Sequence, residues 1–566
     1  MKILIIGGGG REHAIAWKLS KSPKVTKLYC APGNAGIGQI AECVPISAME
    51  FDKLADFAQE NGIDLTVVGM DDPLVGGIVD VFEARGLRVF GPRKNAAILE
   101  GSKAFSKDLM KKYGIPTAAY ENFHSPEDAI EYLKTAKMPI VLKADGLALG
   151  KGVLICNTRE EAMEGVKTLM LDKQFGAAGD TIVVEEFMTG REVSVLTFVD
   201  GNTYRVMTSA QDHKRAKDGD QGLNTGGMGT FSPSPFYTKE VDAYCREHIY
   251  QPTVDAMRSE GRTFQGIIFF GLMLTKEGPK VLEYNARFGD PETQVVLPRM
   301  KNDIVDLFEA CIDQTLDKID LQFEDNAAVC VVLASDGYPV HYEKGLPISG
   351  LEAFDGKDDY FVFHAGTKKQ GDTFVTNGGR VLGVTATGKE YKKISAVFLA
   401  FLIGTAIIIP LAVSGEVEFA TAGLLTLITG GSYVVSYVMG GKYKALLDAD
   451  RRIYILYALD SVSVIISCVF RVLALNAGLG IIIVQLINLA CIAIKNIGYV
   501  LYVRTRYVKV DYKHVPDLKA IGKRWNVLIH SIAGIVVNNT DVIILTLFGS
   551  LKIVSVYGIY NMVFGN

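Results

Sequence analysis

The chain has 566 residues, enough for several domains, and its 59 basic and 63 acidic residues give a net charge of −4. This balance excludes a polycation, so nucleic acid is not an expected partner. Eight cysteines lie scattered without the spacing of a metal site, which favours buried free thiols in a reducing compartment. Charge is dense before residue 393 and sparse after it, so the chain divides into a charged part and an apolar part.

The first 101 residues alternate short apolar runs with helical stretches. The run Ile3–Ile6 follows Met1 directly, so we expect a buried strand and no signal peptide. Further strand ends are expected at Val67–Gly69 and Val89–Pro92. This rhythm predicts a Rossmann-like α/β domain with a parallel sheet, located in the cytoplasm.

A glycine-rich turn, residues 7–10, follows the first strand and opens a helix. Glycines let the backbone approach a phosphate at a helix N-terminus, so Gly9 and Gly10 are candidate anion-binding residues. A tight turn without a ligand is the alternative. The spacing of Gly7, Gly9 and Ala14 departs from the usual dinucleotide fingerprint, which disfavours a nicotinamide cofactor.

From residue 102 to 322 the pattern is α+β, with strands expected at 140–143 and 181–184. Lys143 lies on the first of these strands, and Lys151 lies in the glycine-rich segment after it. Such a pair suits a nucleotide clamp, because lysines offset phosphate charge while the loop excludes water. A surface position is the alternative for either lysine alone. The strand end at 183–188 either presents groups to adenine and ribose or is an ordinary strand end.

Two polar segments complete the candidate site. Glu283 and Asn285 lie two residues apart, so they share one face of a strand and offer the hard oxygen ligands that suit Mg²⁺. Arg287 is expected on the same face, where it can stabilise a transferring phosphoryl group. The basic, glycine-rich segments 211–215 and 224–229 suit a sugar phosphate. The alternative for both is that these polar side chains only contact solvent, on the strand face and in the loop, and bind no ligand.

Taken together, these strings resemble the phosphoribosylamine–glycine ligase family of ATP-grasp enzymes. The resemblance runs from Met1 to about Gly388 and rests on GGGGREHA, EGSKAFSKD, KADGLALGKGV, QDHKR, NTGGMG and NARFGDPETQ. It implies a Rossmann-like domain at 1–101, an ATP-grasp domain at 102–322 and a truncated, β-rich C-terminal domain at 323–393. The family continues with a helix, and the loss of that helix is expected to expose an apolar sheet face.

The resemblance also implies a reaction and a set of residues. Glycine would be joined to 5-phosphoribosylamine through glycyl phosphate, giving glycinamide ribonucleotide, ADP and phosphate in purine synthesis. The residues expected to hold ATP are Lys103, Lys143, Lys151, Glu185, Glu186, Phe187, Met188 and Glu192. Those expected around glycine and phosphoribosylamine are Gly9, Gly10, Asp212, Lys214, Arg215, Asn224, Gly226, Gly227, Arg287, Asp290 and Glu292. Glu283 and Asn285 would hold Mg²⁺ or Mn²⁺, and the residues expected to act catalytically are Arg287, Lys143 and Asp290.

After residue 393 the chain is mostly apolar. Five runs are long enough to span a bilayer, at 394–414, 419–439, 453–470, 479–503 and 526–548, and a sixth begins near Val554. Basic residues are concentrated in alternate loops, which places the enzyme part on the cytoplasmic side. Buried helices of a soluble domain are the alternative.

Residues 446–462 and 522–563 resemble a polysaccharide (O-antigen type) flippase of the multidrug/oligosaccharidyl-lipid/polysaccharide exporter superfamily. The resemblance implies that 394–566 is an all-α fragment of five to six helices in the bacterial inner membrane, in contact with the lipid bilayer. Asn538, Asn539 and Asp541 would line its interior. With both transporter ends missing, transport is not expected. Three interpretations remain: a membrane-tethered ligase, a flippase fragment with an incidental soluble part, or a chimeric reading frame without function.

Overall fold

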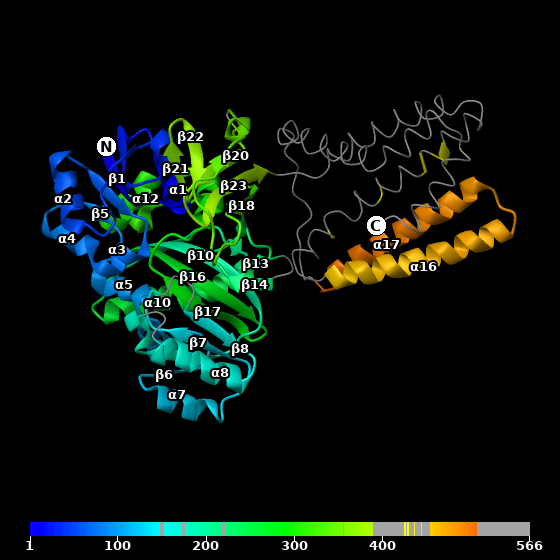
Figure 1. The fold of residues 1–566 in the computed structure, drawn as a ribbon, viewed down its shortest axis with the longest axis horizontal. Coiled ribbons are helices and arrows are strands. Elements are labelled where there is room, and N and C mark those ends of the chain that lie inside the picture. The colour runs from blue at the N-terminus through cyan, green and yellow to red at the C-terminus, as the bar shows by residue number, and fades with distance from the viewer. Residues whose placement is uncertain are drawn as a thin grey trace. The chain divides into compact units, whose positions relative to one another are not determined.

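The computed structural model describes residues 1–147, 152–172, 176–217, 221–354, 356–388 and 453–506, together with positions 424, 425, 427, 428, 435 and 443. The chain divides into two compact units, Met1–Gly388 and Lys389–Asn566 (Figure 1). The predicted spans at 394–414 and 526–548, the one beginning near Val554, and the polar residues Asn538, Asn539 and Asp541 lie outside the described residues, as does Lys151. The span at 419–439 is described only at isolated positions.

A five-stranded parallel sheet opens the first unit, in the order β3-β2-β1-β4-β5. Its strands are β1 (Lys2–Gly7), β2 (Lys27–Pro32), β3 (Glu42–Cys43), β4 (Leu65–Val68) and β5 (Val89–Phe90). Ile3–Ile6 are fully buried, because helices cover both faces of the sheet. One face packs on α1 (Gly10–Leu19) and α12 (Ile304–Ile312), and the other on α2 (Phe51–Glu60), α3 (Asp71–Gly76) and α4 (Ile78–Ala84). The strands predicted for this domain are confirmed.

Two four-stranded sheets form the middle of the unit. The first has the order β6-β9-β7-β8 and is covered by α7 (Pro126–Leu133) and α8 (Arg159–Val166); its strands are β6 (Tyr120–Phe123), β7 (Ile140–Ala144), β8 (Val153–Cys156) and β9 (Ile182–Glu186). The second has the order β11-β10-β16-β17, with β10 (Arg191–Asp200), β11 (Tyr204–Val206), β16 (Gln265–Thr275) and β17 (Gly278–Asn285). Its core includes residues of α5 (Lys94–Gly101), α6 (Lys103–Tyr113), α9 (Lys239–Cys245) and α10 (Gln251–Ser259).

A third large sheet joins distant parts of the chain, in the order β12-β15-β18-β23-β20. β12 (Gln211–Asp212) and β15 (Gly229–Ser232) come from the middle of the chain, whereas β18 (Ala327–Ala334), β20 (Tyr360–His364) and β23 (Arg380–Gly388) come from the end of the unit. Two smaller sheets are formed by the segments that connect these strands. One is a hairpin of β13 (Arg215–Lys217) and β14 (Gln221–Asn224). The other has the order β19-β22-β21, with β19 (Pro347–Ile348), β21 (Thr367–Gln370) and β22 (Thr373–Thr376).

β18 alternates between a buried and an open face. Ala328 and Cys330 are buried, whereas Val329, Val331 and Leu333 are 49%, 55% and 49% exposed. Strands of period two place such residues on one side of the sheet. β18 therefore presents an apolar face to one side of the sheet. The expectation that a lost helix exposes this face concerns residues after 388, which lie outside the described residues.

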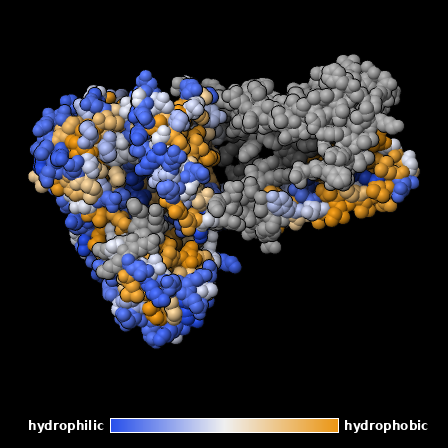
Figure 2. Space-filling view, viewed as in Figure 1, coloured by the Kyte–Doolittle hydropathy of each residue, from blue (hydrophilic) through white to orange (hydrophobic). Residues whose placement is uncertain are grey.

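The described part of the second unit contains a helical hairpin, α16 (Ile453–Asn476) and α17 (Ile481–Arg506). Figure 1 shows the two helices side by side, and the segments Ile455–Asn476 and Ile481–Thr505 are long and apolar enough to cross a membrane. The hairpin carries much apolar surface (Figure 2). Between the helices, Lys495 Nζ lies 2.6 Å from Asp460 Oδ1, and Tyr499 donates to the same oxygen at 2.9 Å. The helices expected at 453–470 and 479–503 are thus present.

Candidate active site

The glycine-rich turn at the start of α1 rests on the side chain of Glu12. The Gly9 amide donates to Glu12 Oε2 at 2.6 Å, and Arg11 Nε lies 2.5 Å from Glu12 Oε1. Gly7 has φ +132°, and a Cβ there would stand 2.5 Å from Glu12 Cγ, so only glycine fits above this carboxylate. Glu12 therefore occupies the Gly9 amide, and Gly10, which begins α1, is buried against Gln294.

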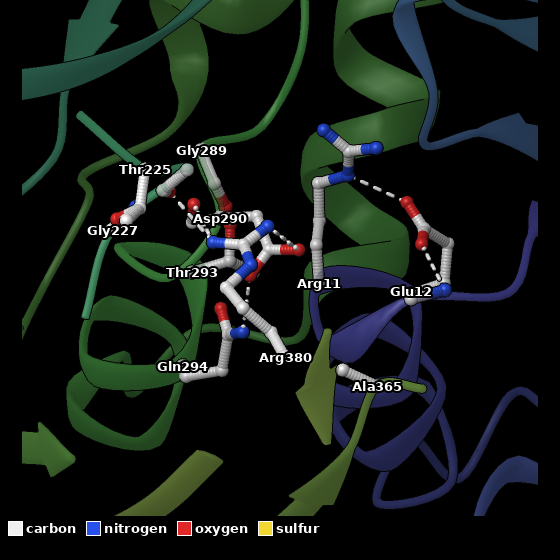
Figure 3. A network of polar contacts seen from close by, with 12 residues as sticks. Arg11, Glu12, Thr225, Gly227, Gly289, Asp290, Thr293, Gln294, Ala365 and Arg380 are labelled. Atoms are coloured by element: carbon white, nitrogen blue, oxygen red, sulfur yellow. Dashed lines mark hydrogen bonds and ion pairs between the residues drawn. The ribbon is translucent and has the colours of Figure 1, made fainter. Parts of the chain in front are cut away.

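Asp290 lies over this turn, at the centre of a polar network (Figure 3). Its Oδ1 accepts from Gln294 Nε2 at 2.7 Å, and its Oδ2 lies 3.1 Å from Arg380 Nη2. A Cβ on Gly10 would stand 3.7 Å from Asp290 Oδ1. Burial alone would raise the pKa of Asp290, but Arg380 and Arg11 lower it below its ordinary value, so this carboxylate is ionised at neutral pH.

Arg287 is held by acids that the sequence did not single out. Its Nη2 lies 3.1 Å from Glu100 Oε1 and donates to Asn285 Oδ1 at 3.2 Å, with Asp71 Oδ2 at 3.9 Å. The prediction that Arg287 shares the strand face of Asn285 needs correction, because β17 ends at Asn285. A bend at residues 286–287, rather than the alternation of the strand, brings Arg287 back to Asn285.

The predicted nucleotide lysines lie on two elements. Ser102 caps α6 by accepting from the Phe105 amide, which places Lys103 in the first turn, where its Nζ donates to Gly146 O at 2.6 Å. Lys143, on β7, lies 3.0 Å from Glu185 Oε1 and donates to Leu282 O at 3.2 Å. Burial lowers the pKa of Lys103. Both ammonium groups are therefore fixed by protein oxygens.

The side chains at the end of β9 and just after it differ in burial and in their contacts. Glu185 is 2% exposed and is shared by Lys143 and by Lys107, whose Nζ lies 3.0 Å from Glu185 Oε2. Burial lowers the pKa of Lys107 to about 8, while Glu185 acts in the opposite direction. Glu186 Oε1 accepts from the Ala119 amide at 3.1 Å. Phe187 is 38% exposed, whereas Met188 is buried.

Four carboxylates surround Lys214. Its Nζ lies 3.4 Å from both Glu192 Oε2 and Glu283 Oε1, and Asp212 and Glu292 also raise its pKa, against the effect of burial. Lys214, followed by Lys143 and Lys103, lowers the pKa of Glu283 to about 2, although burial opposes this. Three lysines thus favour the ionised form of this one carboxylate, and Lys214 is in contact with it.

Glu292 lies on the far side of the same cluster. Its Oε1 accepts from Ser194 Oγ at 3.0 Å. Burial and the neighbouring Asp212 raise the pKa of Glu292 to about 7, and burial also raises the pKa of Asp212. The cluster therefore combines a carboxylate that is fully ionised at neutral pH, Glu283, with one that titrates there.

A divalent cation fits Glu283 and Asn285. The described residues contain no group of three or more His, Cys, Asp or Glu side chains arranged to hold a metal. Glu283 supplies an ionised carboxylate, and Asn285 Oδ1 accepts one hydrogen bond from Arg287 and keeps a lone pair. Two hard oxygens from the protein suit Mg²⁺ when phosphates and water complete its shell.

Only some residues of the 211–229 segment lie at the site. Arg215 donates to Gly222 O at 2.8 Å and pairs with Asn224 within the β13–β14 hairpin, apart from the carboxylate cluster. Gly227 has φ +111°, and a Cβ there would stand 2.5 Å from Pro291 Cδ. The loop that carries Gly226 and Gly227 therefore touches the loop that carries Asp290.

The residues of this site that were not predicted from the sequence include Glu12, Asp71, Glu100, Lys107 and Arg380. Lys107 and Glu100 fall inside or at the edge of the string EGSKAFSKD, but their partners lie far away in sequence, and periodicity does not reveal them. Arg380 follows two glycines in a β-rich segment and carried no signal of its own.

Comparisons with known proteins agree with this geometry. Models of the N domain, the ATP-grasp (A) domain and the C domain of phosphoribosylglycinamide synthetase match residues 1–100, 101–293 and 328–399. The chain is 51% identical to a phosphoribosylamine–glycine ligase from Caldanaerobacter subterraneus subsp. tengcongensis, over 69% of this chain and 94% of that one. It is 50% identical to the ligase of the same name from Halalkalibacterium halodurans, over 70% and 92%.

Solved structures give the same result. A phosphoribosylamine–glycine ligase from Thermotoga maritima aligns with TM-score 0.59 and 34% identity, over 69% of this chain and 94% of that one. N5-carboxyaminoimidazole ribonucleotide synthetase from Thermus thermophilus aligns with TM-score 0.50 and 20% identity, over 70% and 96%. At that identity the second similarity concerns the fold alone.

Proposed function

The chain belongs to the phosphoribosylglycinamide synthetase family through its N, ATP-grasp and C domains, and on this basis we propose that it joins glycine to 5-phosphoribosylamine with cleavage of ATP. The products are glycinamide ribonucleotide, ADP and phosphate, as in purine synthesis. The observation that carries the proposal is the set of positive charges around Glu283: Lys214 Nζ lies 3.4 Å from its carboxylate, and Lys143 and Lys103 also lower its pKa. Such an arrangement suits a metal–triphosphate complex, because it holds cationic side chains and an anionic oxygen within one site.

The reaction has two steps. The glycine carboxylate attacks the γ-phosphorus of ATP, which forms glycyl phosphate and releases ADP. The amine of phosphoribosylamine then attacks the glycyl carbonyl carbon, which breaks the bond to phosphate, loses a proton and forms the amide. Lys103 and Lys143 are suited to hold the phosphates, and Arg287 to offset the charge of the transferring group. Mg²⁺, bound by Glu283 and Asn285, would supply further charge neutralisation on the triphosphate.

The substrate end of the site is proposed to lie between the glycine-rich turn and the Asp290 loop. Gly10 opens α1, where a helix N-terminus favours an anion such as the sugar phosphate. Asp290 lies beside Gly10 and is ionised at neutral pH, which suits the recognition of an amino group. Asp212 and Glu292 offer further acceptors nearby, and phosphoribosylamine and glycine both carry amines.

For the second unit we propose a membrane-embedded fragment of flippase type that tethers a cytoplasmic enzyme to the inner membrane. The length and apolar composition of α16 and α17 support this assignment. So does the pairing of Asp460 with Lys495, since charged residues within apolar helices find partners. A single sequencing read across codons 380–400 tests the competing interpretation, a chimeric reading frame.

Purified full-length chain in detergent tests the enzyme. ADP release should require both glycine and freshly prepared phosphoribosylamine in the presence of ATP and Mg²⁺. Lys143→Ala and Glu283→Ala should abolish it, whereas Lys167→Ala should not, because Lys167 is 52% exposed and pairs only with Glu164, one turn away on the surface, among the contacts described. ADP release without dependence on glycine, or equal rates in all variants, would refute the assignment.

A further inference from the structure

Arg380 links two loops of the active site from a strand of the C-terminal sheet. It is the first residue of β23, and its Nη1 donates to Gly226 O at 2.6 Å and to Asp290 O at 2.9 Å. Its Nη2 forms the ion pair with Asp290 Oδ2 at 3.1 Å. Figure 3 shows its side chain extending to Asp290, with Thr225 and Gly227 nearby. One guanidinium therefore binds residues that lie 154 and 90 positions away in sequence.

The contact leaves little freedom to either loop. The Arg380 side chain is 21% exposed, and a Cβ on Gly226 would stand 3.0 Å from its Cζ, so the guanidinium lies close against that glycine. Gly227 in turn touches Pro291. A planar guanidinium provides several donors in fixed directions, which the single ammonium of lysine cannot reproduce.

We propose that Arg380 is a positioning residue for the phosphoribosylamine and glycine end of the site. It holds the Gly226–Gly227 loop against the Asp290–Glu292 loop and keeps the Asp290 carboxylate beside the glycine-rich turn. The identity of the substrates rests on the proposed function, whereas the positioning itself does not. Lys103 and Lys143 bind Gly146 O, Glu185 and Leu282 O, none of which contacts Arg380, so ATP binding should be independent of this residue.

The test compares Arg380→Gln and Arg380→Lys with Arg205→Gln in the full-length chain. Arg205 is the matched control, because its guanidinium also binds backbone carbonyls, those of Ile319 and Asp317, outside the site. Arg380→Gln should raise the KM for glycine or phosphoribosylamine about tenfold or more, since charge-assisted hydrogen bonds are lost, while the KM for ATP stays within about twofold. Arg380→Lys should restore little, and Arg205→Gln should leave all three KM values unchanged.

Hydrogen exchange supplies a readout that needs no activity. In Arg380→Gln, peptides covering 224–229 and 289–293 should exchange faster than in the wild type, and in Arg205→Gln they should not. Unchanged exchange in both peptides overturns the proposal, as does an equal rise of the ATP and glycine KM values. If exchange responds as expected but the wild type shows no glycine-dependent ADP release, the positioning stands and the proposed function fails.

Discussion

Lys107 Nζ and Glu185 Oε2 lie 3.0 Å apart in the interior of the enzyme unit, where their side chains are 3% and 2% exposed. Glu185 also binds Lys143 through its other oxygen, at 3.0 Å. One buried carboxylate thus holds two lysines, of which Lys143 is the candidate phosphate ligand. Lys107 shares the negative charge of Glu185 and so limits how strongly that charge binds Lys143.

We expect Lys107→Met to lower the free energy of unfolding of this unit by about 2 kcal/mol, because Glu185 loses one of its two buried cationic partners and keeps only Lys143. Lys111→Met, on an exposed position of the same helix, should cost less than about 0.5 kcal/mol. Urea denaturation followed by Trp17 fluorescence measures both. The background Trp525→Phe makes Trp17, which packs on Phe361, the sole tryptophan of the chain. Equal losses in the two variants would contradict the expected role of the pair.

The titration of Glu292 predicts a pH dependence of stability. Its pKa is raised to about 7, above the value of 4.5 expected in the unfolded chain, so the folded state binds the proton more tightly. The stabilisation from this group is therefore full below pH 4.5 and is lost as the pH rises to about 7. His13 and His364, with pKa values lowered by burial to about 3 and 4, act in the opposite direction over part of this range.

Glu292→Gln isolates the contribution of this group, since the amide resembles the protonated acid. The difference in free energy of unfolding, variant minus wild type, should therefore be larger at pH 7.5 than at pH 5. Glu121→Gln, at an exposed position on β6, is the control and should show no such difference. Urea denaturation at the two pH values measures it, and a difference of the opposite sign would show that Glu292 is ionised in the fold.

Lys214 should weaken the binding of divalent metals when no nucleotide is present, because its ammonium lies 3.4 Å from both Glu283 and Glu192. A unit charge about 4 Å away contributes about 4 kcal/mol at an effective dielectric constant of about 20, and water at this partly open site reduces that value. Lys214→Met should therefore bind Mn²⁺ about tenfold more tightly than the wild type. Mn²⁺ titration monitored by electron paramagnetic resonance measures the change. Lys280→Met, on the same strand as Glu283, should match the wild type, and an unchanged or weaker affinity in Lys214→Met would refute the prediction.

The Asp460–Lys495 pair should govern insertion of the hairpin. Lys495→Met removes the ammonium that lies 2.6 Å from Asp460 between apolar helices, at a cost of about 3 kcal/mol. Labelling of a cysteine introduced at Ala477 with a membrane-impermeant maleimide, in a background without Cys468 and Cys491, reports how many molecules insert. We expect fewer for Lys495→Met and recovery for the double variant with Asp460→Asn. Failure of the double variant to recover would show that the ion pair itself, rather than charge balance, is needed.

The sequence predicted those parts of the fold that depend on local patterns. Apolar runs identified β1, β4, β5, β7 and β9, because strands buried on both faces lack polar interruptions. The spacing of Glu283 and Asn285 placed them together, since both lie on β17. The same spacing argument was wrong for Arg287, which was predicted on the same strand face, because β17 ends two residues earlier, at Asn285.

Contacts between segments far apart in the sequence could not be predicted from local patterns. Glu185 lies one residue before the end of an apolar strand, which suggested a role toward ribose, but two lysines bind its carboxylate, and one of them was not predicted. Gly9 was a candidate for an anion, yet its amide donates to Glu12. Such outcomes depend on which side chains the tertiary fold brings together, and neither propensity nor periodicity carries that information.

The position of β23 in its sheet limits where this gene can be joined to another. β23 lies between β18 and β20, so a breakpoint before Gly388 would take a strand out of the interior of the sheet, together with the Arg380 contacts. A breakpoint just after it removes none of the strands that the structure describes in that sheet. The change to an apolar sequence begins at about residue 394, a few residues beyond this limit. A junction in this interval therefore keeps β23 between its two neighbours and leaves the contacts of Arg380 within the enzyme unit.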